Sequence, residues 1–116
     1  MNNKKERIAD VIDRSRDELF ELSKKIHDHP ELGFEEFQAV EAISSVLERH
    51  GFQVQKGYGG LQTAFRADKA GKGKGPNVAF LAEYDALRGI GHGCGHNLIA
   101  TCSTCLLYTS PSPRDL

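Results

Sequence analysis

Two residue types that commonly bind metal ions, Cys94 and His96, stand two positions apart in the glycine-rich stretch 89–97. In an extended loop, side chains at this spacing leave the backbone on the same side, so the thiol and the imidazole can converge on one small volume. Thiolate and imidazole suit zinc and its first-row neighbours, whereas calcium and magnesium prefer oxygen. A flexible loop with an incidental buried thiol would have the same composition. Two ligands do not close a tetrahedral site, so the spacing indicates a metal site without completing it.

An apolar run over residues 76–84 precedes this loop and ends at two carboxylates, Glu83 and Asp85. Nearly continuous apolar sequence predicts a β-strand that is covered on both faces. Such a strand would place its carboxylates at the edge of a sheet, beside the loop that carries the thiol and the imidazole. His92 could reach the same ion or could shape the loop.

The elements that must position these residues begin with two helical patterns. Apolar residues recur at three- and four-residue steps between Ile8 and Ile26, which predicts an amphipathic helix that ends before Pro30. A second helix is predicted over residues 34–47, with Gly51 as its C-terminal stop.

Shorter patterns follow along the chain. Residues 52–55 and 61–67 are predicted to form two strands around a glycine-rich turn. Residues 98–101 are predicted to open a further helix, with Asn97 as its N-cap. The mixture of helices and strands predicts an α/β fold class.

Three other histidines have simpler interpretations. His27 and His29 flank the end of the first predicted helix, where the helix dipole favours a cation, and a capping or surface role is expected. His50 stands just before a helix-terminating glycine and is expected to be exposed.

Three ordered motifs resemble those of the co-catalytic metallopeptidases and amidohydrolases, a family that includes aminoacylases, indoleacetyl-amino-acid hydrolases and aminobenzoyl-glutamate hydrolases. The resemblance covers about residues 15 to 104. The motifs are His29-Pro30-Glu31-Leu32-Gly33-Phe34-Glu35-Glu36, then Leu81-Ala82-Glu83-Tyr84-Asp85-Ala86-Leu87, then His92-Gly93-Cys94-Gly95-His96-Asn97.

The resemblance implies roles for individual residues. Cys94 and His96 match metal ligands of the amidohydrolase branch. Asp85 matches an acidic position that orients a ligating histidine, and Glu83 stands where peptidase relatives carry that histidine. The implied cofactor is a divalent metal, zinc or manganese, with two ions in the complete protein.

The resemblance also implies an architecture and an activity. Residues 1–104 would be the N-terminal portion of a mixed-sheet, helix-flanked, zinc-peptidase-like catalytic domain, truncated before its general base and remaining ligands. The parent enzyme would hydrolyse an amide bond in N-acyl amino acids, aminobenzoyl-glutamate-like conjugates or dipeptides, and would be a homodimer. The fragment itself is expected to be inactive.

Residues 105–116 depart from this pattern, because helical periodicity stops and two prolines appear. The string Cys105 to Asp115 matches one reading frame of a common transposase sequencing adapter. The tail is therefore expected to be non-native, with the genuine sequence ending near Thr104.

Composition narrows the remaining classes of function. Fifteen basic and 16 acidic residues give a net charge of -1, which offers no basic footprint for nucleic acid and no electrostatic reason to bind a membrane. Three cysteines without framework spacing favour a reducing compartment, so a cytoplasmic location is expected. Two alternatives remain open: a stand-alone metal-binding or regulatory module without catalysis, and a thiol-redox protein that uses Cys94 but lacks a Cys-x-x-Cys partner.

Overall fold

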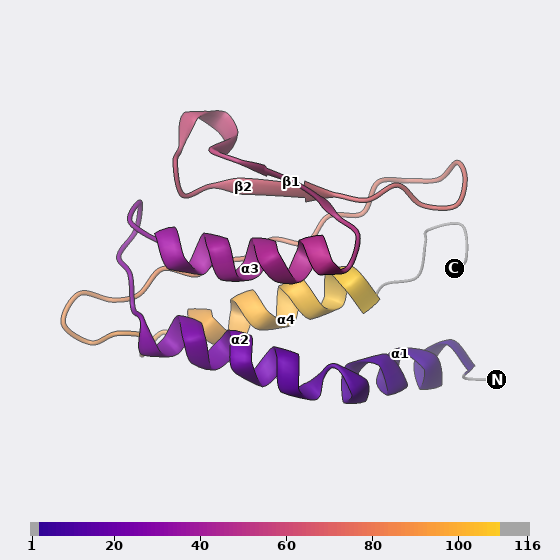
Figure 1. Ribbon diagram of the computed structural model, residues 1–116, viewed down its shortest axis with the longest axis horizontal. Coiled ribbons are helices and arrows are strands. Elements are labelled where there is room, and N and C mark those ends of the chain that lie inside the picture. Colours follow the sequence, from indigo (N-terminus) through magenta and orange to yellow (C-terminus); the bar gives the residue numbers. More distant parts are fainter. Residues whose placement is uncertain (1–2, 110–116) are drawn as a thin grey trace.

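The helices and strands follow one another in an order close to the predicted one. The computed structural model describes residues 3–109, which form α1 (Asn3–Arg14), α2 (Arg16–Asp28), α3 (Phe37–Arg49), β1 (Gln53–Lys56), the short 3-10 helix η1 (Tyr58–Gly60), β2 (Phe65–Asp68) and α4 (His96–Thr109). Figure 1 shows α2, α3 and α4 in contact with one another, while the β1–β2 hairpin lies against α3. This arrangement agrees with the predicted α/β class.

The first predicted helix is divided into α1 and α2 at Ser15. The backbone of Ser15 has ψ near 4° instead of a helical value, although the Ser15 amide still donates to the carbonyls of Val11 and Ile12. The Ser15 side chain makes no capping hydrogen bond to the first turn of α2, so the break rests on the backbone angles alone. The helix ends at Asp28, as predicted, because the residue before Pro30 is disfavoured in the helical region.

The second predicted helix begins three residues later than expected. Phe34 has a φ of 71°, which no right-handed helix allows, so it lies in the turn before α3. At the other end the prediction is confirmed: Gly51 has a φ of 86° and donates to the carbonyl of Glu48. Phe52 donates to the carbonyl of Leu47, which completes a Schellman motif.

The hairpin covers one side of α3. Strands β1 and β2 are antiparallel, with Val54 opposite Ala67 and Lys56 opposite Phe65. The side chains of Val54, Phe65 and Ala67 pack against the core, so one face of the hairpin is apolar and half-buried. The second strand is shorter than predicted because residues 61–64 belong to a turn in which the amide of Ala64 bonds to the carbonyl of Leu61.

The hydrophobic core lies among α2, α3, α4 and the hairpin. Its most enclosed members come from α3, where Ile43 is completely buried, and from α4, where Ala100 is completely buried. Among residues 3–109 there is no helix with the length and apolar character needed to cross a membrane.

The predicted buried strand over residues 76–84 is wrong for the structure. This segment has no regular secondary structure, and Val78 and Leu81 expose 54% and 87% of their surface. A strand needs a neighbour to satisfy its backbone groups, and within the described range β1 and β2 pair only with each other. Figure 1 shows the segment as a coil that crosses the molecule from the hairpin to the loop before α4.

The last helix begins two residues earlier than predicted, at His96, so the N-cap assignment of Asn97 is wrong. The carbonyl of Gly95 accepts the first helical bonds, from the amides of Leu98 and Ile99. Asn97 lies inside the first turn, is buried, and donates from its side-chain amide to the hydroxyl of Ser23 on α2. The helix also continues to Thr109, beyond the predicted end of helical periodicity, and residues 110–116 lie outside the described part of the chain.

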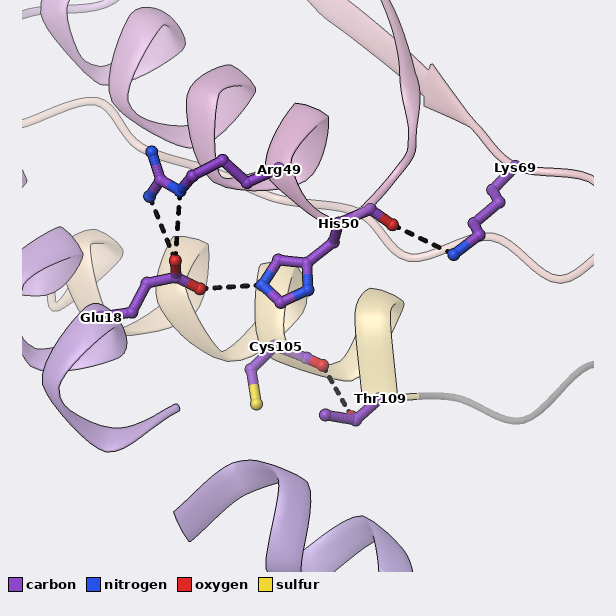
Figure 2. Close-up of polar contacts among 6 residues, drawn as sticks. All are labelled: Glu18, Arg49, His50, Lys69, Cys105 and Thr109. Carbon is purple, nitrogen blue, oxygen red and sulfur yellow. Dashed lines mark hydrogen bonds and ion pairs between the residues drawn. The ribbon is translucent and has the colours of Figure 1, made fainter. Parts of the chain in front are cut away.

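The C-terminal end of α3 is tied to α2 by a cluster of charged groups (Figure 2). Glu18 accepts from Arg49 at 3.2 Å and lies 2.8 Å from the Nε2 atom of His50, whose ring stacks on Tyr108. Partial burial acts to raise the pKa of Glu18, but the hydrogen bonds from His50 and then Arg49 outweigh it and lower the pKa below the usual 4.5. The expectation that His50 is exposed is therefore wrong, since these contacts cover most of its ring.

Candidate metal centre

The loop that precedes α4 reverses direction in a tight turn. Leu87 and Gly91 exchange two backbone hydrogen bonds, each 2.9 Å long. Gly95 then adopts a φ of 81°, a conformation that side chains rarely tolerate, immediately before the helix starts at His96. The glycines thus let the chain turn and deliver His96 to the first position of α4.

The structure brings two predicted site residues, His96 and Asp85, into direct contact. The Nδ1 atom of the ring lies 2.8 Å from the Asp85 carboxylate and 3.0 Å from the Asp85 carbonyl. A carbonyl oxygen can only accept, so Nδ1 must carry the proton, and the neutral ring then has its lone pair on Nε2. This is the arrangement in which a carboxylate orients a histidine for metal binding.

The Nε2 atom of His96 faces a second carboxylate. It stands 3.3 Å from an oxygen of Glu83, whose side chain is two-thirds exposed. Two acceptor atoms at this separation repel unless a proton or a metal ion lies near both. Ligand atoms in a tetrahedral zinc site with bonds of about 2.0–2.2 Å stand roughly 3.3–3.5 Å apart, so this spacing fits a shared cation.

The third predicted site residue, Cys94, lies on the same side of the loop. Its thiol donates a long contact of 3.8 Å to the Asp85 carbonyl, the oxygen that also accepts from His96. The thiol is exposed and reduced. Thiolate, imidazole and carboxylate are suitable ligands for zinc or manganese, and these side chains fit part of such a site. Within residues 3–109 no three His, Cys, Asp or Glu side chains are grouped closely enough to hold an ion by themselves.

His92 is buried and makes no hydrogen bond to Asp85, Cys94 or His96. It is 9% exposed, and neither ring nitrogen has a hydrogen-bond partner within the described residues. Burial lowers its pKa, and the neighbouring His27 and His96 lower it further, while Asp85 and the Ile26 carbonyl oppose the shift. That carbonyl does not meet the geometry of a hydrogen bond to the ring. A lowered pKa favours the neutral ring, which both a loop-shaping residue and a metal ligand would need, so the role of His92 stays a prediction.

Contacts at the end of α2 match the simpler interpretations of two histidines. The Nδ1 atom of His29 bonds to the carbonyl of Lys25 in the last turn of the helix at 2.8 Å, so its capping role is confirmed. His27 is exposed and lies 3.1 Å from Asp28.

A shallow hollow of about 350 Å³ adjoins the two carboxylates. Apolar side chains and carboxylates share its wall, namely Phe34, Leu61, Ala82, Glu36, Glu83 and Asp85. Tyr84 also lines the hollow and donates from its hydroxyl to the carbonyl of Thr63 at 2.6 Å. Burial, followed by the charge of Glu36, raises the pKa of this phenol to about 12. Glu83 and Asp85, which contact His96, therefore also line this hollow.

One positioning contact could not be predicted from the sequence. Glu31 bonds through its carbonyl to the amide of Ala86, next to Asp85, and through its carboxylate to the start of α3. The only sequence signal was the place of Glu31 in the first of the three motifs.

Comparison with known proteins supports the resemblance between motifs. No family model matches the chain. The chain is 40% identical over 113 residues to a p-aminobenzoyl-glutamate hydrolase subunit of Escherichia coli (strain K12), covering 83% of this chain and 23% of that protein. It is 42% identical over 106 residues to Xaa-Arg dipeptidase of Homo sapiens, covering 81% and 24%.

A more distant relative belongs to the same group. N-acetyl-L-cysteine deacetylase of Bacillus subtilis (strain 168) is 33% identical over 94 residues, which cover 69% of this chain and 22% of the relative. The chain spans about a quarter of the length of the curated relatives it matches. It therefore belongs, as a partial sequence, to the amidohydrolase and peptidase family that these proteins represent.

Proposed function

We propose that the chain is part of a metal-dependent hydrolase that cleaves linear amide or peptide bonds. Cys94 and His96 bind a divalent ion, zinc or manganese, and Asp85 orients His96. The observation that carries this proposal is the 2.8 Å contact from the Asp85 carboxylate to Nδ1 of His96, since it leaves Nε2 available to a metal. The 3.3 Å approach of Glu83 to that nitrogen adds a carboxylate that can share the ion.

The roles of the side chains follow from their chemistry. A divalent ion, when bound, polarises an amide carbonyl and lowers the pKa of a coordinated water. Asp85 keeps the proton of His96 on Nδ1 and fixes the plane of the ring. Cys94 binds as a thiolate, so acid should displace the ion by protonating both the sulfur and Nε2. Two ions are proposed for the complete protein, with further ligands and the general base supplied by sequence outside this chain.

The proposed substrates are small amides of amino acids. The relatives are named for p-aminobenzoyl-glutamate, Xaa-Arg dipeptides and N-acetyl-L-cysteine, and N-acyl amino acids, aminobenzoyl-glutamate-like conjugates and dipeptides are the corresponding candidates. The hollow beside Glu83 and Asp85 supports a substrate of that size. A homodimeric parent protein in the cytoplasm, of the zinc-peptidase fold, is part of the same proposal.

The 116-residue chain alone should bind metal weakly and hydrolyse nothing. It spans 23% of one relative and 24% of another. The groups around His96 are one thiol and carboxylates, and residues 3–109 do not supply a complete set of ligands. A stand-alone metal-binding module would need that complete set, and the similarity to named hydrolases favours the enzyme.

The test uses the uninterrupted reading frame that contains this chain, expressed from an adapter-free clone. Purified protein with zinc or manganese should hydrolyse at least one of the three amide classes, and a chelator should abolish the activity. Cys94→Ser should lower kcat/KM by about 100-fold or more. Cys102→Ser, which changes an exposed cysteine on α4, is the matched control and should retain full activity. Activity that survives both chelation and Cys94→Ser would contradict the proposal.

A further inference from the structure

Helix α3 receives no capping hydrogen bond from its own N-cap residue, Glu36. The Glu36 carboxylate instead accepts from the hydroxyl of Thr63 at 2.8 Å. The capping group is Glu31, whose two carboxylate oxygens each accept from one amide, of Gln38 and of Ala39, at 2.9 Å. A negative charge at this place also complements the helix dipole.

The main chain of Glu31 makes a second contact, on its other side. Its carbonyl accepts from the amide of Ala86 at 2.7 Å. Ala86 is only 5% exposed and directly follows Asp85, the residue that holds the ring of His96. One residue thus joins the start of α3 to the segment that carries the orienting carboxylate.

The helix at one end of this connection is firmly held. Ala39 and Val40 in its first turn are 3% and 4% exposed and belong to the hydrophobic core. The segment at the other end has no regular secondary structure before Ala86, so it has few backbone bonds of its own to fix it. The hydroxyl of Tyr84, which donates to the carbonyl of Thr63, and the backbone bonds between Leu87 and Gly91 also hold this segment. Glu31 adds the hydrogen bond that joins the segment to the start of α3.

We infer that Glu31 is a positioning residue for the candidate metal centre. Its carboxylate is bonded to the start of α3, and its carbonyl holds the amide of Ala86. Glu31 thereby fixes the position of the neighbouring Asp85 relative to His96. This inference rests on the proposed function, because the pair matters through the ion that His96 binds. A helix cap alone would stabilise α3 without any effect on residues 85 and 96.

The experiment compares Glu31→Ala and the conservative Glu31→Gln with Glu35→Ala, which removes an exposed carboxylate from the same loop. The 116-residue chain is used throughout. Amide hydrogen exchange is measured by NMR at Ala86 and, as an internal reference for global stability, at Ile43. Cobalt(II) titration follows the thiolate–cobalt absorption band of Cys94.

In Glu31→Ala the exchange rate at Ala86 should rise by a factor about five times larger than the factor by which the rate at Ile43 rises. The affinity for cobalt should fall about threefold to tenfold. Glu31→Gln keeps one acceptor oxygen and should give intermediate values, which also covers the case in which the alanine variant fails to fold. Glu35→Ala should match the unmodified chain. Equal changes at Ala86 and Ile43, or unchanged exchange at Ala86, would overturn the inference.

The failure of the proposed function gives a different result. If the unmodified chain shows no cobalt band that Cys94→Ser removes, the metal assignment fails, and the catalytic meaning of Glu31 fails with it. If the band is present and Glu31→Ala leaves both the affinity and the Ala86 exchange unchanged, only the positioning inference fails.

Discussion

Replacing Asp85 by asparagine should weaken metal binding while the protein remains folded. The Asp85 carboxylate accepts from Nδ1 of His96 at 2.8 Å, and its negative charge makes Nε2 a better electron donor to a metal. An asparagine oxygen can accept the same hydrogen bond but carries no charge. The Asp85 carbonyl, 3.0 Å from Nδ1, is unaffected by the substitution and should keep the ring near its place.

The expected size follows from these two contacts. Loss of a carboxylate that supports a metal-bound histidine typically weakens binding about 10- to 100-fold. Because one of the two acceptors at Nδ1 remains, the effect of Asp85→Asn should lie near tenfold, or about 1.4 kcal/mol. Asp85→Ala removes the side-chain acceptor altogether and should approach 100-fold.

The assay is competition for zinc between the 116-residue chain and a chromophoric chelator at pH 7. Asp68→Asn, which alters an exposed carboxylate paired with Arg66 on the hairpin, is the matched control and should bind zinc as the unmodified chain does. Thermal unfolding without metal checks that each variant is folded. Equal zinc affinity for Asp85→Asn, Asp85→Ala and the unmodified chain would refute the orienting role.

Three further predictions concern stability and loop geometry. The lowered pKa of Glu18 means that its charged form stabilises the fold at pH values above 4.5, and this stabilisation disappears as the pH falls through the folded-state pKa. The difference in the free energy of unfolding between the unmodified chain and Glu18→Gln, measured by urea unfolding, should therefore shrink below pH 4.5. A difference that stays constant with pH would count against the ion cluster. Gly95→Ala forces a side chain into a φ of 81° and should cost about 1–2 kcal/mol. In Gly93→Ala the new methyl group would stand 2.8 Å from Cγ2 of Ile90, a clash that rotation of this exposed side chain can relieve, so the second variant should lose less stability than the first in thermal unfolding. Ile43→Ala empties a fully buried position and should cost about 2–5 kcal/mol, while Ile90→Ala, at a position 71% exposed, should change the free energy of unfolding by less than about 0.5 kcal/mol; similar losses for the two would contradict the assigned core.

Local patterns in the sequence were enough to predict most helices and the hairpin. Helical periodicity predicted α2 and most of α3, and Gly51 marked the end of α3 because a left-handed residue is needed there. The strand predicted over residues 76–84 failed for a different reason. Apolar composition shows that a segment can be buried, but a strand also requires a partner, and partners are set by the tertiary fold.

The candidate site, like the fold, could be predicted from the sequence only in part. The sequence predicted that Cys94, His96 and Asp85 would lie near one another, and the structure places both Cys94 and His96 in contact with Asp85. Their role toward a metal remains a prediction. The sequence also predicted that the Glu83 carboxylate would lie beside this loop, and it stands 3.3 Å from His96. The connection made by Glu31 was missed, because it depends on how segments distant in the sequence pack together.

The origin of residues 105–116 is open to a separate check. The proposed boundary near Thr104 stays a proposal, since the continuation of α4 to Thr109 does not identify where the sequence came from. Resequencing from an adapter-free library should replace the tail with a different continuation, and recovery of the same residues would show that the tail is genuine.

The central claim, that Cys94 and His96 bind the same ion, is tested most directly by X-ray absorption at the zinc edge. The zinc-loaded chain should show one sulfur neighbour at about 2.3 Å and nitrogen or oxygen neighbours at about 2.0–2.1 Å. Cys94→Ser should lose the sulfur neighbour, and Cys102→Ser should keep it. A zinc spectrum with no sulfur neighbour, or one whose sulfur survives in Cys94→Ser, would contradict the account.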